Sequence, residues 1–403
     1  MSKKKKKSPP QTAGGYKKFI QEIHHTILQL DLSDELSKMS NALRREMYDY
    51  RIRFLNPVAG NNFVSVKELK YMADLNKSYF REKSLPLDEM RISGNQLNHL
   101  YSYHFGWFEL LKQNRIQKEP EVVEKMKMLQ DAVFKKLSEI YILNFFKVIT
   151  QMSSPDYKYY GLNIRPAGIF KECPRFEFMC KIYAFYPRKK VVEIGGIKRL
   201  AFQLAKPLAD QSIVTWITIE TKLLKKFYNG EREKLDVYIQ SHALKRMAER
   251  LDLLDKKGIN YAIWKNTNTI TEFKHYKKYL LLPFRLFDVV VGYLLANIVD
   301  DCLLFRTFLF VTHNCTPEGD RLKQLTGLSK EDINYWHIDR LSTFVNLKEE
   351  KYPKLMKLFE AAGLGNLNNL KEISFDINTM QEANLDGLSE YMQLDKAVEN
   401  FCN

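Results

Sequence analysis

The sequence has 403 residues, of which 45% are hydrophobic and 28% are charged. This composition excludes wholesale disorder, and the length is sufficient for two or three domains. The five cysteines form no closely spaced pair, because they stand at Cys173, Cys180, Cys302, Cys315 and Cys402. We therefore expect neither a disulfide framework nor a zinc site.

The net charge of +15 is distributed unevenly along the sequence. Residues 1–20 contain seven lysines and no acid, whereas residues 371–403 contain seven acids and two lysines. A basic protein is attracted to nucleic acids and to anionic surfaces, so the overall charge favours a phosphate-rich partner. A lysine-rich end is equally typical of a solubilising tail, and the charge alone leaves both interpretations open.

No segment predicts insertion into a membrane. Residues 3–7 resemble the basic start of a signal peptide, but no apolar stretch follows them. The apolar run over residues 289–311 is interrupted by Asp300, Asp301 and Arg306, whose charges are costly inside a bilayer. We therefore expect a cytoplasmic protein that has no membrane partner.

The first part of the chain predicts a disordered basic tail and a helical domain. Residues 1–15 are of low complexity, and residues 16–152 have a helical periodicity. Ser65 and Glu68 have the spacing of a capping box, which predicts that a helix begins there. The clearest expected helix covers residues 120–151, where apolar side chains recur at three- and four-residue steps.

The middle of the chain, residues 153–345, predicts an α+β domain. β-Branched and aromatic residues predict a first group of strands over residues 175–186, 191–194, 212–221 and 236–240. A turn at Gly195 and Gly196 follows the second of them. Three further extended runs cover residues 280–287, 289–299 and 302–313, and the last two predict a hairpin around Asp300 and Asp301.

Helices are expected on either side of this second group of strands. Ser241 is expected to cap a helix that begins at His242 and ends at residues 256–258, and a second helix is expected through residues 261–265. Thr316 and Ser329 have the positions of further helix caps. With residues 346–403 as a helical C-terminal segment, the fold class is α+β: an N-terminal helical region, a β-rich middle with antiparallel strands, and a helical C-terminus.

One short helix carries most of the functional argument. His242, Arg246, Glu249 and Arg250 fall on one face of the segment SHALKRMAER, residues 241–250. Cleavage of a phosphodiester needs a base and cations, so His242 and Glu249 are candidate catalytic residues and both arginines are candidate phosphate-binding residues. The alternative is a solvated helix face in which Arg246 and Glu249 form an ordinary ion pair.

The same residues carry a resemblance to a known family. Ser241 to Arg250 resembles the HAxxRxxER helix of a small bacterial domain of unknown function, which is similar to the RelE/ParE-type toxins and particularly to their BrnT branch. The resemblance covers residues 236–315 at most. It implies a RelE/BrnT-like layer in the fold, action on messenger RNA or on gyrase, and an antitoxin as protein partner. It assigns the site to His242, Arg246, Glu249 and Arg250.

His313 is a further candidate catalytic residue. It follows an apolar strand and precedes the helix expected after Thr316, and such strand ends often open onto active sites. A histidine in this position is also common as an ordinary polar surface residue, so both interpretations stay open. The motifs GxxxxGK[ST], GxGxxG and HExxH are absent from the sequence. We therefore expect no cofactor and no metal.

Two functions remain open on these observations. The leading hypothesis is a nucleic-acid-binding protein, for RNA rather than DNA, with metal-independent RNA cleavage in a toxin or defence system. The alternative is a non-enzymatic nucleic-acid-binding or scaffold protein of a mobile element or defence system. The sequence does not decide whether the protein is an enzyme.

Overall fold

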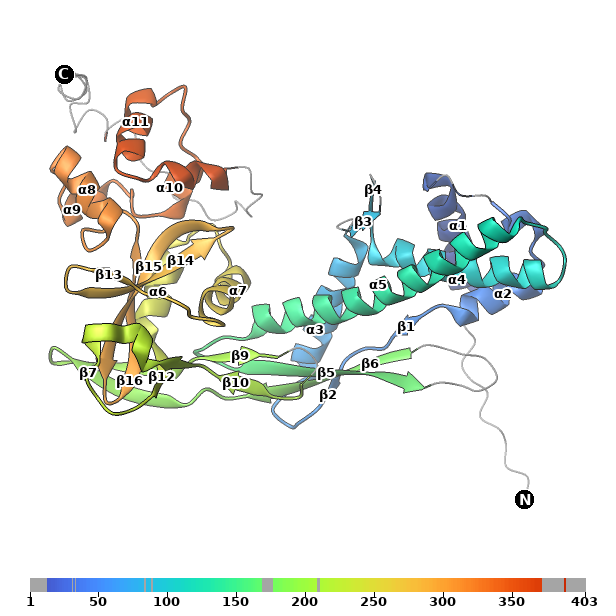
Figure 1. Ribbon diagram of the computed structural model, residues 1–403, viewed down its shortest axis with the longest axis horizontal. Helices are drawn as coiled ribbons and strands as arrows, with labels where there is room; N and C mark the ends of the chain where they lie inside the picture. Colours follow the sequence, from blue (N-terminus) through green and yellow to red (C-terminus); the bar gives the residue numbers. More distant parts are fainter. Residues whose placement is uncertain are drawn as a thin grey trace. The chain divides into compact units, whose positions relative to one another are not determined.

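The computed structural model describes residues 13–30, 32, 34–82, 85–87, 90–168, 177–208, 211–371 and 388. Helices and antiparallel sheets confirm the expected α+β class (Figure 1). The basic tail, residues 1–15, lies almost entirely outside the described residues. So does the acidic end of the chain beyond Lys371, apart from Leu388.

The chain divides into two compact units. The first comprises residues 1–148, 161–184 and 209–213, and the second comprises residues 149–160, 185–208 and 214–403. Each unit is therefore made of three separate stretches of the sequence, whereas the predicted domains were continuous and followed one another along the chain.

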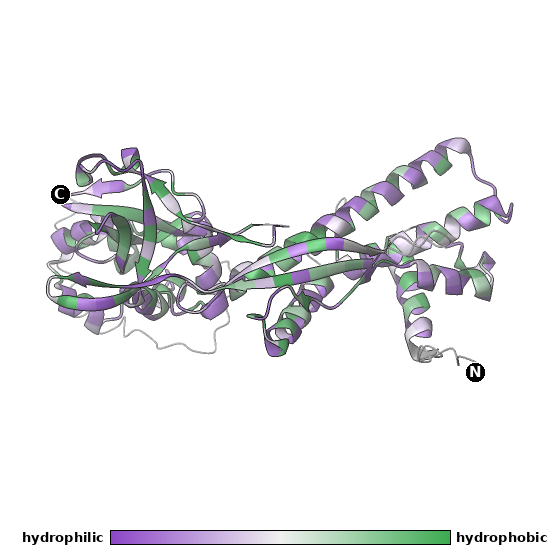
Figure 2. Cartoon of the chain, turned by 90° about the horizontal axis from the view of Figure 1, so that it is seen from below, coloured by the Kyte–Doolittle hydropathy of each residue, from purple (hydrophilic) through white to green (hydrophobic). Residues whose placement is uncertain are grey.

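Helices dominate the first unit. They are α1 (Ala13–Gln29), η1 (Leu36–Lys38), α2 (Asn41–Tyr50), α3 (Val66–Arg81), α4 (Gly94–Lys112) and the greater part of α5 (Pro120–Met152). The predicted capping box of Ser65 and Glu68 is confirmed at the start of α3. The predicted long helix is confirmed as α5. In Figure 2 hydrophobic and hydrophilic residues alternate along this helix.

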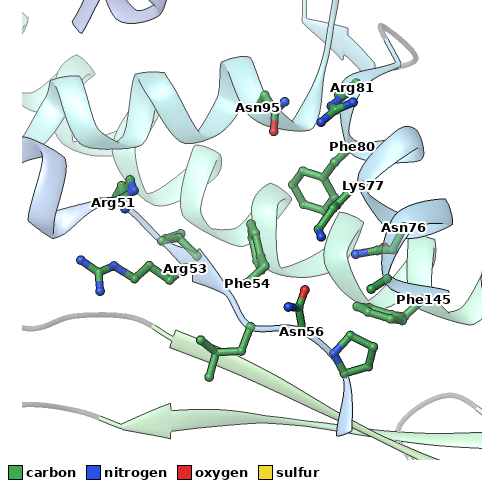
Figure 3. A pocket seen from close by; sticks show the side chains of 14 residues that line it. Arg51, Arg53, Phe54, Asn56, Asn76, Lys77, Phe80, Arg81, Asn95 and Phe145 are labelled. Carbon is green, nitrogen blue, oxygen red and sulfur yellow. The ribbon is translucent and has the colours of Figure 1, made fainter. Parts of the chain in front are cut away.

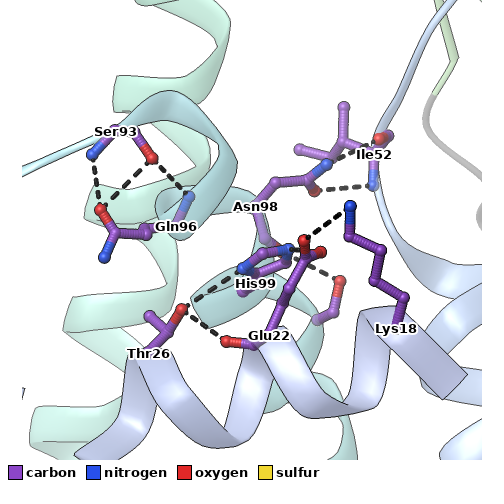
Figure 4. A network of polar contacts seen from close by, with 9 residues as sticks. Lys18, Glu22, Thr26, Ile52, Ser93, Gln96, Asn98 and His99 are labelled. Carbon is purple, nitrogen blue, oxygen red and sulfur yellow. Dashed lines mark hydrogen bonds and ion pairs between the residues drawn. The ribbon is translucent and has the colours of Figure 1, made fainter. Parts of the chain in front are cut away.

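Polar contacts fix α4 against its neighbours in the first unit (Figure 4). Gln96 completes a capping box with Ser93 and also donates to the Gln29 side chain of α1 at 2.8 Å. The Asn98 side chain pairs with both backbone groups of Ile52, at 3.2 and 3.0 Å. These two hydrogen bonds hold residues 51–57, the segment after α2, in a defined position on α4.

Strands, including most of β5 and β6, complete the first unit. β1 (Arg53–Phe54) and β2 (Val58–Ala59) pair in parallel with β6 (Glu177–Phe185), which also pairs with β5 (Tyr159–Gly168). β3 (Leu85–Leu87) and β4 (Met90–Ile92) form a separate antiparallel pair. β6 lies within the strand predicted over residues 175–186, of which residues 175 and 176 lie outside the described part.

The second unit contains an eight-stranded sheet in the order β13-β14-β15-β16-β12-β8-β7, with β11 beside β12. Its strands are β7 (Lys189–Ile194), β8 (Ile197–Gln203), β11 (Thr218–Glu220), β12 (Lys234–Gln240), β13 (Lys274–Tyr276), β14 (Tyr279–Leu286), β15 (Val289–Val299) and β16 (Cys302–Phe310). β12 pairs with β16 in parallel. The hairpin predicted around Asp300 and Asp301 is confirmed, with φ of 48° and 52° at these residues, as a two-residue turn requires.

Helix α6 (Ser241–Arg250) packs against β16, β8 and β12. Val237 and Ile239 of β12 share one hydrophobic core with Ala243 and Met247 of α6. Tyr238, between them in sequence, belongs to a different cluster on the other face of the sheet. This alternation is the period-two pattern of a strand buried on both faces.

Two predicted helix boundaries in this region are wrong. Ser241 lies inside α6, and the N-cap is Gln240, whose side chain makes no capping hydrogen bond. Residues 256–258 do not end a helix. They begin α7 (Lys256–Thr267), because the Asp255 side chain accepts a hydrogen bond from the backbone N–H of Gly258 and caps it.

Smaller elements complete the second unit. β9 (Ala205–Pro207) pairs with β10 (Val214–Trp216), and η2 covers Thr221–Phe227. The caps predicted at Thr316 and Ser329 are confirmed at the start of α8 (Pro317–Thr326) and α9 (Lys330–Tyr335). The chain continues through α10 (Leu341–Val345), α11 (Pro353–Ala361) and η3 (Gly365–Leu370), whose apolar residues join the core beneath the sheet.

Candidate functional site

A cleft of about 650 Å³ lies in the second unit between α6, β16, the loop after β16 and α9. Among the residues that the structure describes, two carboxylates line it, Glu331 and Asp339. Six arginine and lysine side chains line it, namely Arg199, Arg246, Arg250, Lys278, Arg306 and Lys330, together with the histidines His242 and His313. Such an excess of positive charge around a concave surface attracts anions.

The polar face of α6 forms one wall of this cleft. His242, Arg246 and Arg250 follow one another at four-residue steps and all line it, while Ala243 and Met247 are buried on the opposite side of the helix. His313, from the loop after β16, lines the same cleft. The structure therefore brings together four of the five residues that the sequence singled out.

Glu249 is the exception among them. It is not among the residues that line the cleft; its carboxylate instead accepts a hydrogen bond from the Arg246 guanidinium at 2.7 Å. Lys245 lies 3.9 Å away on its other side. In this position Glu249 orients Arg246 and reduces the charge that Arg246 presents.

The side chain of Arg250 is already bound to another residue of the protein. Its guanidinium forms an ion pair with Asp339, and the two side chains are only 15% and 9% exposed. It also donates to the Asn334 side chain at 3.4 Å. Burial lowers the pKa of Arg250 and raises the pKa of Asp339, although each charge favours the other. This pairing leaves Arg250 less available to a phosphate than its place in the motif suggests.

The surroundings of His242 favour its neutral form. Partial burial lowers its pKa, and the nearby charges of Arg199 and Arg246 lower it further. A neutral imidazole has a free lone pair and can accept a proton from a substrate hydroxyl. The position of His242 in the first turn of α6, close to the positive end of the helix dipole, acts in the same direction.

His313 is also neutral, and its hydrogen bond defines the tautomer. Burial, with smaller contributions from Lys330 and Arg250, lowers its pKa to about 4. Its Nδ1 accepts a hydrogen bond from the backbone N–H of Cys315 at 3.2 Å, so the proton of the neutral ring is on Nε2. His313 can therefore donate a hydrogen bond to a bound anion, but it is a weak general acid at neutral pH.

Four cations of the cleft were not predicted from the sequence. They are Arg199 on β8, Lys278 before β14, Arg306 on β16 and Lys330 at the start of α9. Of these, the side chains of Arg199, Arg306 and Lys330 make no hydrogen bond or ion pair with any described residue. At Arg306 the register between β15 and β16 shifts by one residue, so that Arg306 has no partner opposite it. Such a bulge redirects a side chain and is common beside binding sites.

The described residues contain no group of three or more His, Cys, Asp or Glu side chains arranged to hold a metal ion. None of the helices that the structure describes combines the length and the apolar character that crossing a bilayer requires.

Comparisons of the chain with protein-family models, with curated proteins and with solved structures find no match. The resemblance to the HAxxRxxER domain therefore remains a hypothesis that depends on residues 241–250.

Proposed function

We propose that the basic cleft of the second unit binds single-stranded RNA and that His242 is the general base for its metal-independent cleavage. The observation that carries this proposal is the charge of the described cleft lining, six arginine and lysine side chains against two carboxylates, of which Asp339 is already neutralised by Arg250. Arg199, Arg306 and Lys330, whose side chains pair with no described residue, supply positive charge for the phosphates. A cytoplasmic location agrees with such a substrate.

The chemistry follows from the neutral state of His242. Its ring accepts the proton of a ribose 2′-hydroxyl, and the 2′-oxygen then attacks the adjacent phosphorus. The bond between phosphorus and the 5′-oxygen breaks, and the leaving oxygen takes a proton from water. The products are a 2′,3′-cyclic phosphate and a 5′-hydroxyl. Arg246, oriented by Glu249, stabilises the charge that develops on the phosphoryl oxygens.

This mechanism predicts a preference for RNA over DNA, because only RNA carries the attacking 2′-hydroxyl. It also agrees with the resemblance of residues 241–250 to a helix of RelE/ParE-like proteins, which would make an antitoxin the natural protein partner. In this scheme Glu249 is a positioning residue, and His242 takes the role of base.

A second function is favoured by one specific observation. His313 is neutral, with a pKa of about 4, and Arg250 is paired with Asp339, so the cleft offers no strong general acid for the leaving oxygen. A cleft with this lining would still bind nucleic acid. The alternative is therefore a non-enzymatic RNA-binding protein whose α6 only contacts phosphates.

One experiment distinguishes the two functions. Labelled single-stranded RNA is incubated with the full chain in EDTA, and both binding and products are measured. We expect cyclic-phosphate products and their loss, by at least 100-fold, in His242→Ala, with binding changed less than threefold. His275→Ala, which removes a histidine of β13 outside the cleft lining, is the matched control. Tight RNA binding without any cleavage product would support the non-enzymatic function.

The role of Glu249 is tested in the same assay. If it only orients Arg246, Glu249→Gln should reduce cleavage about tenfold, whereas complete loss would identify Glu249 as the base.

A further inference from the structure

The first unit contains a separate cavity of about 340 Å³. The segment 51–57, the C-terminal half of α3, Asn95 of α4 and Phe145 of α5 line it. Figure 3 shows this cavity from close by. Its volume is within the range of small-molecule sites, and none of its lining residues belongs to the basic cleft.

The charge around this cavity is positive. Arg51, Arg53, Lys77 and Arg81 line it, and no Asp or Glu of the described part of the chain does. Two of these cations are engaged elsewhere: Arg51 lies 3.6 Å from the centre of the Tyr48 ring, and Arg53 pairs with carboxylates of Asp49 and Glu177 at 3.4 and 3.6 Å.

Lys77 and Arg81 are the cations that remain for a ligand. They stand one helical turn apart on α3 and are both exposed. Lys77 has only a 3.7 Å contact with Asp74, in which both side chains are more than half exposed. Arg81 forms no hydrogen bond or ion pair with any described residue. Two adjacent cations of this kind suit a phosphate group.

A buried amide also points to a ligand. Asn76, the residue before Lys77 on α3, is only 6% exposed, and its Oδ1 atom accepts no hydrogen bond from any described residue. Figure 3 shows Asn76, Asn56 and Lys77 directed toward the space beside the ring of Phe54. Buried polar atoms are nearly always satisfied in proteins, so an unsatisfied acceptor at the wall of a cavity marks a place for a donor from outside.

Aromatic rings form the apolar wall. Phe54 and Phe80 have ring centres 4.8 Å apart, and Phe145 lies on the same lining. A Cβ atom at Gly94 would lie 2.5 Å from Phe80, so only glycine at the start of α4 allows this position of the ring. Together with the hydrogen bonds between Asn98 and Ile52, this close packing holds the wall in place.

We propose that this cavity binds one nucleotide. The aromatic wall suits the flat face of a base, the Asn76 oxygen accepts from the donors on its edge, and Lys77 and Arg81 take the phosphate. A site for phosphate alone would need neither the phenyl rings nor a buried amide. The nucleotide can come from two sources, a free mononucleotide or one unit of a single strand, and the chemistry of recognition is common to both.

Binding measurements with the full chain test this proposal. AMP, GMP, CMP, UMP, inorganic phosphate and a ten-residue single-stranded RNA are titrated by calorimetry. We expect at least one nucleotide or the RNA to bind, and Lys77→Glu with Arg81→Glu to weaken that binding at least tenfold. Lys70→Glu, an exposed lysine of the same helix outside the cavity lining, should change it less than twofold.

Asn76→Leu separates recognition from folding. Because it removes an unsatisfied buried acceptor, it should leave the melting temperature unchanged or higher while it weakens nucleotide binding at least tenfold. Loss confined to mononucleotides identifies a free ligand, and loss confined to the RNA identifies a strand. Equal binding by all variants, no binding at all, or phosphate binding as tight as nucleotide binding would overturn the proposal. None of these outcomes depends on cleavage at the basic cleft.

Discussion

Arg250 of α6 and Asp339 before α10 form an ion pair that is almost removed from solvent, with 15% and 9% of their side chains exposed. They are far apart in the sequence and are joined only by the fold. The Asp252 side chain, two residues after Arg250, accepts hydrogen bonds from the backbone and the hydroxyl of Ser342, at 3.0 and 2.6 Å. The end of α6 is thus tied to the start of α10 at two neighbouring points.

Arg250→Ala should destabilise the protein strongly. It leaves the carboxylate of Asp339 buried without its partner, and loss of one member of a buried pair typically costs about 3–5 kcal/mol. Chemical denaturation measures this change in the free energy of unfolding. Arg246→Ala is the control, because the Arg246–Glu249 pair is 41% and 34% exposed and its loss should cost about 1 kcal/mol or less. Equal losses in the two variants would contradict a structural role for Arg250.

The cleft charge predicts a defined salt dependence of RNA binding. Removing one phosphate-binding cation reduces the slope of log K against log salt concentration by about 0.7 for a single strand. Lys330→Ala and Arg306→Ala should each flatten the slope by about this amount, because both cations lack a partner among the described residues. Lys265→Ala, an exposed lysine at the end of α7, should leave the slope unchanged. Fluorescence anisotropy at several salt concentrations provides the measurement.

Local sequence patterns predicted many elements of this fold. The capping boxes at Ser65 and Ser329, the proline-started helix after Thr316 and the turn at Asp300 and Asp301 are each determined by residues within a few positions of one another. Helical spacing likewise placed His242, Arg246 and Arg250 on one face of α6. These features depend on short-range geometry, which one sequence contains.

What the sequence could not predict depends on contacts between distant segments. Arg199 reaches the cleft through the pairing of β8 with β12, and the register shift at Arg306 arises in the pairing of β15 with β16. The positions of Lys330 and of Asp339, the partner of Arg250, depend on how α9 and the loop after it pack against α6. The cavity beside Asn76 likewise requires segment 51–57, α3 and α4 to meet. The prediction of helix starts from local sequence also failed at one position. Serine and aspartate both favour the N-cap, but Asp255 occupies one and Ser241 does not.

The stability of the protein should fall as the pH falls from about 6.5 to 4. His104 is fully buried, neither of its ring nitrogens has a hydrogen-bond partner among the described residues, and burial lowers its pKa from 6.5 to about 4. The unfolded chain therefore binds a proton in this range that the folded chain does not. The stabilisation is complete above pH 6.5 and is lost toward pH 4, by up to about 3 kcal/mol for this group.

His104→Leu tests this dependence, because leucine cannot take up a proton in the unfolded state. Thermal unfolding between pH 4 and 7 should show a shallower loss of stability in this variant. His25→Leu, a change at an exposed histidine of α1, is the control and should follow the parent protein. The same change of stability with pH in all three proteins would show that His104 does not contribute to the pH dependence.

Two roles are open for the acidic C-terminal segment. It either competes with nucleic acid for the basic cleft or packs against the hydrophobic core of the second unit. Leu388 is fully buried in the hydrophobic core of the second unit, with helices α8 to α11, and this favours closure of the core. Leu388→Ala should therefore lower the free energy of unfolding by about 2–5 kcal/mol, as large-to-small changes in a core do. RNA affinity at a temperature where the variant is folded should stay within twofold of the parent. Tighter RNA binding with unchanged stability would instead support restraint of the cleft by this segment.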